Sequence, residues 1–248
     1  MPRLSSAALL VLAQVACERP IAPEAPAPEV ATPSAPDKAE DVPGDDAQRL
    51  GPPSEALASI QLWIPGDLSA DDALPKPDQS LLALCRGADW TLGKASIEAF
   101  TDPMVDMEGE QSGRRLKGPC EAAALLGNMP EPNPSAGRTW KTGALEAGKP
   151  HGFSEADGIQ LVHRRLGDSG YAVDLVVDAT PWNLVVHEAT DDGSPSLHWA
   201  GDIDGDGKLD LILNETPKYS YSLYALYVSS AATKGPVARV AEVQVMGD

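Results

Sequence analysis

Short apolar runs separated by turn residues make up most of the C-terminal half of the chain. The runs are rich in Val, Leu, Ile and Tyr, residues that favour strands, and Gly, Pro or Asp stands between them. Asp191-Asp192-Gly193 predicts a hairpin turn between two of these runs. The pattern predicts a mainly β domain, an antiparallel meander or sandwich, with strands at residues 159–165, 171–178, 182–188, 196–201, 209–214, 222–228 and 237–245.

The preceding part of the folded region has a weaker pattern. Strands are expected near residues 59–64, 79–86 and 95–100, because apolar residues there end at turn signals. The segment CEAAALL at 120–126 predicts one of one or two short helices, and residues 129–158 are expected to form a loop. Apolar residues make up 42% of the 248 residues, which is enough for a packed core. We therefore assign a β-rich globular domain to 56–248, with a possible sub-boundary near 148–158.

The N-terminus has the pattern of an export signal. Arg3 supplies a positive charge, and a mostly apolar run follows that is too short for a permanent membrane span. The run ends in Gln14-Val15-Ala16-Cys17, which resembles the lipobox of bacterial lipoproteins, although that family usually has Leu where Gln14 stands. The resemblance implies a signal peptide at 1–16 and lipidation of Cys17. An ordinary cleaved signal is the alternative.

Residues 17–55 have the composition of a tether. Pro, Ala and acidic residues dominate, and almost no large apolar residue is present, so a disordered linker is expected. In a polyproline II conformation such a linker reaches on the order of 100 Å. A lipid anchor and a tether together predict a protein of the bacterial cell envelope, attached to the outer membrane or displayed at the cell surface.

Cys85 and Cys120 are the two cysteines that remain after Cys17. Outside the cytoplasm such a pair favours a disulfide, and a loop of this length gives about 4 kcal/mol of stabilisation in the chain-entropy model. Two separate buried thiols are the alternative. No C-x-x-C motif is present in the chain, so neither a redox motif nor a zinc site is indicated.

The segment GDIDGDGKLDLIL at 201–213 carries four aspartates at the spacing D-x-D-x-D-G-x-x-D. A tight turn that directs alternate side chains inward brings such carboxylates together, and calcium takes six to eight oxygen ligands. Gly207 permits the bend. The predicted calcium ligands are Asp202, Asp204, Asp206 and Asp210 with the backbone carbonyl of Lys208. The alternatives are Asx turns without a metal, or magnesium or manganese in place of calcium.

The segment does not match an EF-hand. That motif has a bidentate Glu at the twelfth loop position, and counting from Asp202 this position holds Leu213. Both flanks of the segment are strand-like, and Leu209, Leu211 and Leu213 share one face. This arrangement resembles the calcium loop of FG-GAP/VCBS repeats, found in integrin-type propellers and bacterial surface proteins. The chain carries a single copy and is too short for a seven-bladed propeller, so the resemblance implies a calcium loop between two strands and not adhesion.

The net charge of −18 opposes binding to nucleic acid and favours cations. No catalytic motif stands out. Gly167-Asp168-Ser169-Gly170 is similar to a serine-protease segment but predicts a β-turn, and His187-Glu188 lacks the second histidine of H-E-x-x-H. The sequence thus predicts a calcium-binding envelope lipoprotein without enzymatic activity. The alternatives are a polysaccharide- or protein-binding surface module, and an envelope hydrolase that uses His187 or His198.

Overall fold

A computed structural model describes residues 47–68, 74–76, 79–85, 90–102, 106–130, 142–154 and 158–246. The chain divides into two units, Met1–Glu40 and Asp41–Asp248, and all described residues belong to the second. The described residues form strands β1 to β17 and contain no helix, so the predicted β class is confirmed. Accordingly, no helix that is long and apolar enough to cross a membrane occurs in this part of the chain.

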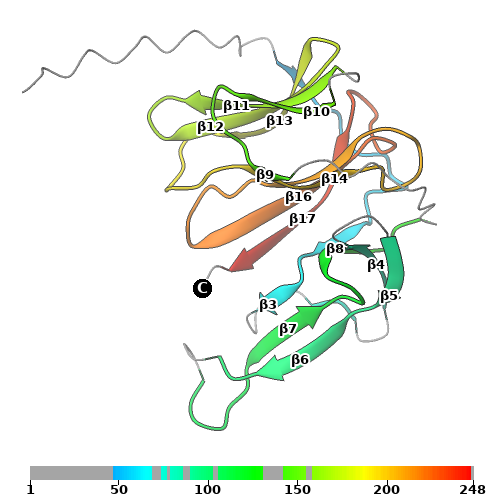
Figure 1. Cartoon of the computed structure of the whole chain (residues 1–248), viewed down its shortest axis with the longest axis vertical. Helices are drawn as coiled ribbons and strands as arrows, with labels where there is room; N and C mark the ends of the chain where they lie inside the picture. The colour runs from blue at the N-terminus through cyan, green and yellow to red at the C-terminus, as the bar shows by residue number, and fades with distance from the viewer. Residues whose placement is uncertain are drawn as a thin grey trace, which may run out of the picture. The chain divides into compact units, whose positions relative to one another are not determined.

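Two sheets of five strands form one part of the second unit (Figure 1). Sheet I has the order β1-β13-β12-β11-β10, and its strands are β1 (Gln48–Arg49), β10 (Pro150–Ser154), β11 (Ile159–Leu166), β12 (Gly170–Val177) and β13 (Thr180–His187). Sheet II has the order β17-β16-β15-β14-β9, and its strands are β9 (Gly143–Ala144), β14 (Ser196–Gly201), β15 (Asp210–Asn214), β16 (Tyr221–Val228) and β17 (Ala238–Met246). All pairs are antiparallel except β1 with β13.

Two smaller sheets precede them in the chain. Sheet III has the order β2-β8-β4-β5, with β2 (Gln61–Trp63), β4 (Ser80–Cys85), β5 (Trp90–Lys94) and β8 (Ala122–Gly127). Sheet IV has the order β3-β7-β6, with β3 (Gly66–Leu68), β6 (Ser96–Phe100) and β7 (Gly113–Lys117). Every pair in these sheets is antiparallel.

The central strand of sheet II, β15, is buried on both faces. Leu211 and Leu213 of β15 pack with residues of sheet I, whereas Ile212 packs with residues of sheet III. This division follows from the pleat, since successive side chains of a strand point to opposite faces. The prediction that Leu209, Leu211 and Leu213 share one face is confirmed, since all three lie in the cluster between sheets I and II. Burial on both faces explains why Leu211 to Leu213 are continuously apolar, whereas the edge strand β17 alternates between buried and exposed residues.

The seven strands predicted in the C-terminal half correspond to β11–β17 with small shifts at their ends. The predicted β-turn at Gly167-Asp168-Ser169-Gly170 connects β11 to β12. The hairpin predicted at Asp191 is wrong, because β13 and β14 belong to different sheets and the segment crosses from one to the other. Gly193 is required at this crossing, since an added Cβ would lie 2.2 Å from the carbonyl oxygen of Thr216.

The helix predicted at 120–126 is wrong, because Ala122–Gly127 is strand β8. This strand lies between β2 and β4, and Ala123 to Gly127 are buried. Pairing on both sides and burial on both faces outweigh the helix propensity of Ala and Leu in so short a segment. The loop predicted at 129–158 is also wrong in part, since β10 and the short β9 lie within it.

The disulfide between Cys85 and Cys120 is confirmed, with Cα atoms 5.9 Å apart. Cys85 is the last residue of β4, and Cys120 lies just before β8, which pairs with β4. The bond therefore closes the end of this strand pair. Cys17 lies outside the described residues, as do the signal peptide and most of the tether, so their predictions remain predictions.

Candidate metal centre

The aspartate segment forms the connection between β14 and β15, as the strand-like flanks predicted. Gly201 pairs with Asp210 in the last register position of the two strands, and residues 202–209 form the loop beyond it. The backbone turns sharply at Gly205 and Gly207, where φ is +80° and +79°. Glycine adopts this left-handed conformation without the steric cost that a Cβ imposes. The role predicted for Gly207 is therefore confirmed, and Gly205 has the same role.

The core fixes the loop from inside. Ile203 is fully buried and packs in the cluster shared by sheets II and III. Leu209, at the other end of the loop, is buried in the cluster shared by sheets I and II. An added Cβ on Gly201 would lie 2.4 Å from the Trp199 ring, so the entry to the loop also requires glycine. The two buried anchors place the backbone of the loop before any ligand binds.

Three of the predicted ligands converge. Asp202, Asp204 and Asp210 each offer a carboxylate oxygen, and these oxygens all lie within 4.8 Å of one another. Asp202 is 8% exposed and Asp210 is fully buried. Like charges at this separation repel each other, and burial adds to the cost of keeping them ionised. A group of three carboxylates in this geometry can hold a metal ion.

Backbone amides support all three of these carboxylates. Asp202 Oδ1 accepts a hydrogen bond from Gly205 N at 2.8 Å, and Asp202 Oδ2 accepts one from Gly207 N at 2.9 Å. Asp204 Oδ1 accepts a hydrogen bond from Asp206 N at 3.2 Å. These are the contacts of Asx turns, which the sequence offered as an alternative. These hydrogen bonds orient the carboxylates, but they do not neutralise the negative charge of the three side chains.

Asp210 is the most deeply placed of the group. Its Oδ2 accepts a hydrogen bond from Ile203 N at 2.6 Å, and its Oδ1 accepts hydrogen bonds from Ser229 N at 2.7 Å and Ser229 Oγ at 2.9 Å. Desolvation nevertheless dominates and raises the pKa of Asp210 to about 7, with the nearby Asp204 adding to the rise. A cation beside Asp210 would favour the ionised form.

Asp206 lies at the edge of this group. Its Oδ1 accepts a hydrogen bond from Lys208 N at 2.8 Å, and its Oδ2 lies 3.0 Å from Ser229 Oγ, the hydroxyl that also contacts Asp210. The Lys208 side chain is exposed, as expected, with Nζ 3.7 Å from Asp206 Oδ2. The structure thus brings together three of the four predicted carboxylates, and a single hydroxyl connects the fourth to them.

Ser229 and Ser230 complete the site and were not predicted. They follow β16, and Ser230 Oγ donates a hydrogen bond to Asp204 Oδ2. The register of β15 with β16 explains their position. Leu211 pairs with Tyr227, and because the strands are antiparallel, the residue before Leu211, Asp210, lies close to Ser229, which follows Tyr227 by two positions. A meander prediction with an assigned register would have found them. The sequence pattern alone does not fix that register.

The histidines considered for catalysis have structural contacts. His198 is half-buried, with Nε2 2.8 Å from the carbonyl oxygen of Ala123, and its ring stacks edge-on against Tyr224. His187 Nε2 lies 3.0 Å from the carbonyl oxygen of Glu215. Neither histidine lines either of two pockets that the described residues form.

Comparison with known protein families, with curated proteins and with solved structures finds no match to this chain. The functional argument therefore depends on the site itself. The structure shows a loop between two strands that brings together three aspartates able to hold a metal ion.

Proposed function

We propose that this protein is a calcium-binding lipoprotein of the bacterial cell envelope, without enzymatic activity, in which one calcium ion stabilises the β-domain. The observation that carries the proposal is the convergence of Asp202, Asp204 and Asp210 within 4.8 Å on a loop anchored in the core. The spacing of the aspartates, which resembles that of FG-GAP/VCBS loops, includes all three of these residues.

Calcium suits the donor set better than zinc or copper. Carboxylate and carbonyl oxygens are the ligands of hard cations, and no histidine or cysteine belongs to the metal-binding group formed by described residues. Asp206 and the Lys208 carbonyl would supply further oxygens. Magnesium favours rigid octahedral sites that retain several waters, whereas a loop with this many protein oxygens suits the larger ion.

A stabilising role follows from where the loop is attached. The loop joins β14 to β15, and Ser229 and Ser230 contact its carboxylates from the connection after β16. A cation at the centre would therefore hold the β14–β15 connection and the β16–β17 connection of sheet II together. Because it binds only the folded loop, it would stabilise the native state by mass action.

Thermal melts of the full chain in calcium and in EGTA test this proposal. With a dissociation constant of about 10⁻⁴–10⁻³ M, 10 mM calcium should raise the melting temperature by about 3–10 °C. Asp204→Ala should abolish the rise, and Asp168→Ala, which removes the same charge from the exposed β11–β12 turn, should retain it. Equal melting temperatures in calcium and EGTA for the unmodified chain would refute calcium binding.

The membrane anchor has its own test. Mass spectrometry of the mature N-terminus in a bacterial host should find Cys17 as the first residue with attached acyl chains. A mature chain that contains an unacylated Cys17, or that starts elsewhere, would reject the lipoprotein assignment and leave the calcium proposal unaffected.

A further inference from the structure

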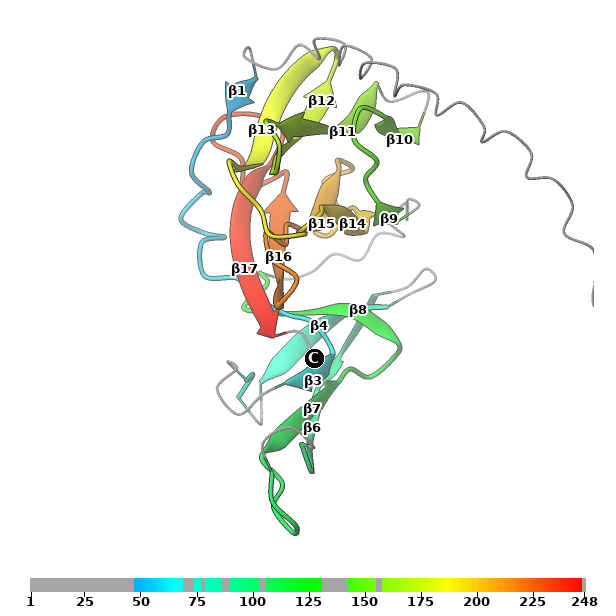
Figure 2. The ribbon, with the colours of Figure 1, turned by 90° about the vertical axis from the view of Figure 1, so that its left-hand side faces the viewer.

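The connection between β16 and β17, residues 229–237, contacts two parts of the molecule that lie far apart in the sequence. Its first two residues, Ser229 and Ser230, contact the carboxylates of the aspartate loop. Residues 231–234 contact the N-terminal segment Gly51–Ser54. Figure 2 shows this segment, which follows β1, beside the connection. The connection therefore links the candidate metal centre to the N-terminal end of the described chain.

Backbone hydrogen bonds hold both ends of the N-terminal segment to the connection. Gly51 N donates a hydrogen bond to the carbonyl oxygen of Lys234 at 3.0 Å, and Ser54 N donates one to the carbonyl oxygen of Ala231 at 2.9 Å. Prolines occupy the two positions between them, and proline has no N–H group. The amides at 51 and 54 are thus the only amides of the segment, and both report whether it lies on the connection.

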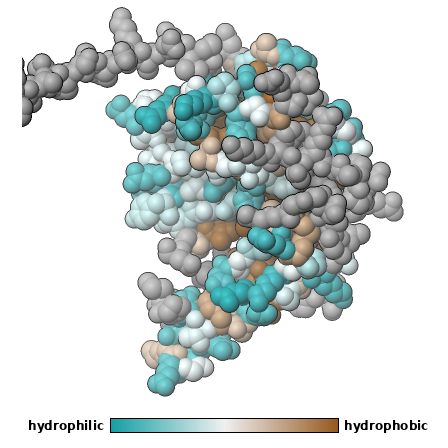
Figure 3. All heavy atoms as spheres, in the orientation of Figure 1, coloured by the Kyte–Doolittle hydropathy of each residue, from teal (hydrophilic) through white to brown (hydrophobic). Residues whose placement is uncertain are grey.

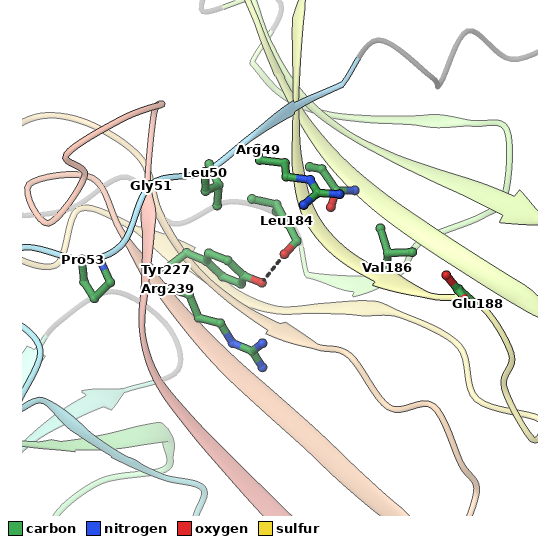
Figure 4. Close-up of a pocket in the computed structure, with 10 residues that line it drawn as sticks. Arg49, Leu50, Gly51, Pro53, Leu184, Val186, Glu188, Tyr227 and Arg239 are labelled. Carbon is green, nitrogen blue, oxygen red and sulfur yellow. Dashed lines mark hydrogen bonds between the residues drawn. The ribbon is translucent and has the colours of Figure 1, made fainter.

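The middle of the segment is held as closely. Thr233 Oγ donates a hydrogen bond to the carbonyl oxygen of Pro52 at 2.7 Å, and Pro53 forms an antiparallel bridge with Ala232. An added Cβ on Gly51 would lie 2.7 Å from Thr233 Oγ. Figure 4 shows Gly51 and Pro53 on the blue segment where it passes the connection. A displacement of the connection would therefore break several contacts of the segment at once.

Hydrogen bonds hold this segment more than burial does. Pro52 is exposed, and the other three residues of the segment are half-buried. Segments with few buried apolar contacts open most readily in a native protein. On the face shown in Figure 3, hydrophilic residues cover most of the described surface and apolar atoms appear in small separate areas. A released segment would meet mainly polar surface among the described residues of that face and would stay solvated.

The beginning of the connection depends on the aspartates. Ser229 donates hydrogen bonds to Asp210 Oδ1 from its N at 2.7 Å and its Oγ at 2.9 Å, and this Oγ lies 3.0 Å from Asp206 Oδ2. Ser230 Oγ donates a hydrogen bond to Asp204 Oδ2. Without a cation the carboxylates repel each other, and any movement that separates them displaces both serines. A cation would fix the carboxylates and, with them, the beginning of the connection.

We propose that calcium bound at the aspartate loop stabilises the docking of Gly51–Ser54 on the β16–β17 connection, and that Ser229 and Ser230 transmit this effect. The coupling rests on the calcium site proposed above and extends it, because it assigns the ion an effect on a segment that contributes no ligand. Coupling between two sites is reciprocal. A displaced segment therefore weakens calcium binding by the same factor by which calcium strengthens the docking.

Hydrogen exchange of the full chain in calcium and in EGTA tests the proposal. Calcium should slow exchange of the Gly51 and Ser54 amides about fivefold or more, the lower end of typical coupling between two sites. The control amides are Asp191 and Tyr219, which donate hydrogen bonds to carbonyl oxygens at the opposite end of sheet II. Their exchange should change much less. Melting temperatures of the same samples show whether calcium is bound.

Substitutions on both sides of the connection test the path. The double variant Ser229→Ala, Ser230→Ala removes two hydroxyls that are not predicted ligands, so calcium should still bind while the slowing at Gly51 and Ser54 decreases. Ser220→Ala, which removes an exposed serine hydroxyl from the β15–β16 connection, should retain the slowing. Gly51→Ala should weaken calcium binding in calorimetry. Gly152→Ala should not, since nothing lies within 4 Å of the added Cβ.

Four results would overturn the proposal while calcium binding stands. Two concern the unmodified chain: unchanged exchange of the Gly51 and Ser54 amides in calcium, or equal slowing of these and the control amides, which would indicate global stabilisation. The other two are full slowing in the double serine variant and an unchanged calcium affinity in Gly51→Ala. If calcium changes neither the melting temperature nor any exchange rate, the calcium site itself is refuted and the coupling with it.

Discussion

Replacing Ile203 by Ala tests whether the core positions the aspartate loop. Ile203 is the loop residue that reaches into the cluster between sheets II and III, and its side chain is 0% exposed. It stands between Asp202 and Asp204, and its backbone amide donates a hydrogen bond to Asp210. The substitution removes buried methyl groups and leaves the four aspartates unchanged.

The expected loss follows from the burial. Truncation of a fully buried Ile to Ala costs about 2–5 kcal/mol, because lost apolar contact and a residual cavity add together. For a domain of this size that loss lowers the melting temperature by about 4–20 °C. If the loop were held only by its own hydrogen bonds and by a metal, Ile203→Ala would lower the free energy of unfolding by about 0.5 kcal/mol or less, as substitutions at surface positions do.

Urea denaturation in EGTA measures this loss without a metal contribution. Val186→Ala is the matched control, since Val186 is 48% exposed and should change the stability by about 0.5 kcal/mol or less. A loss below about 1 kcal/mol for Ile203→Ala in EGTA would refute the inference that the core anchors the loop. Repeating the experiment in calcium should show a smaller calcium-induced gain than in the unmodified chain, because the loop is less ordered before the ion binds.

Three further results are expected. Reduction of the Cys85–Cys120 bond, or its replacement by two serines, should lower the stability by about 4 kcal/mol, measured by urea denaturation with and without a reductant. Gly201→Ala should cost about 1–3 kcal/mol, measured by thermal melts, because the new methyl group overlaps the Trp199 ring; an unchanged midpoint would contradict that packing. Burial lowers the pKa of His187 from 6.5, so its contribution to stability is present above pH 6.5 and lost as the pH falls through the lowered value. Urea midpoints between about pH 5 and 7 should therefore decline less in His187→Gln than in the unmodified chain.

Strands β11 to β17 could be predicted because their residues carry a strong local signal. Runs of Val, Leu, Ile and Tyr ended by Gly, Pro or Asp define β11 to β17 almost to the residue. Strand β8 was missed for the opposite reason, since Ala and Leu favour a helix locally and only pairing with β2 and β4 makes the segment a strand. Strand β10 was missed because its residues, PHGFS, carry almost no strand signal and depend on β11 for pairing.

In the candidate site too, local features could be predicted and features that depend on tertiary pairing could not. The spacing of the aspartates and the strand-like flanks predicted both the loop and its place between two strands, because all of that information lies within a dozen residues. Ser229 lies 19 residues from Asp210, and the register of β15 with β16 decides that they meet.

The short strand β1 has a mechanical consequence. It pairs with β13 through only Gln48 and Arg49, and beyond them the chain leaves the edge of sheet I, where Gly51 N donates to the carbonyl oxygen of Lys234. Tension applied through the N-terminal segment would meet this two-residue contact before it reached any longer strand. The first element to peel away would be β1 itself, so a pull on the tether would open this edge of sheet I while the buried residues of the three apolar cores stayed packed.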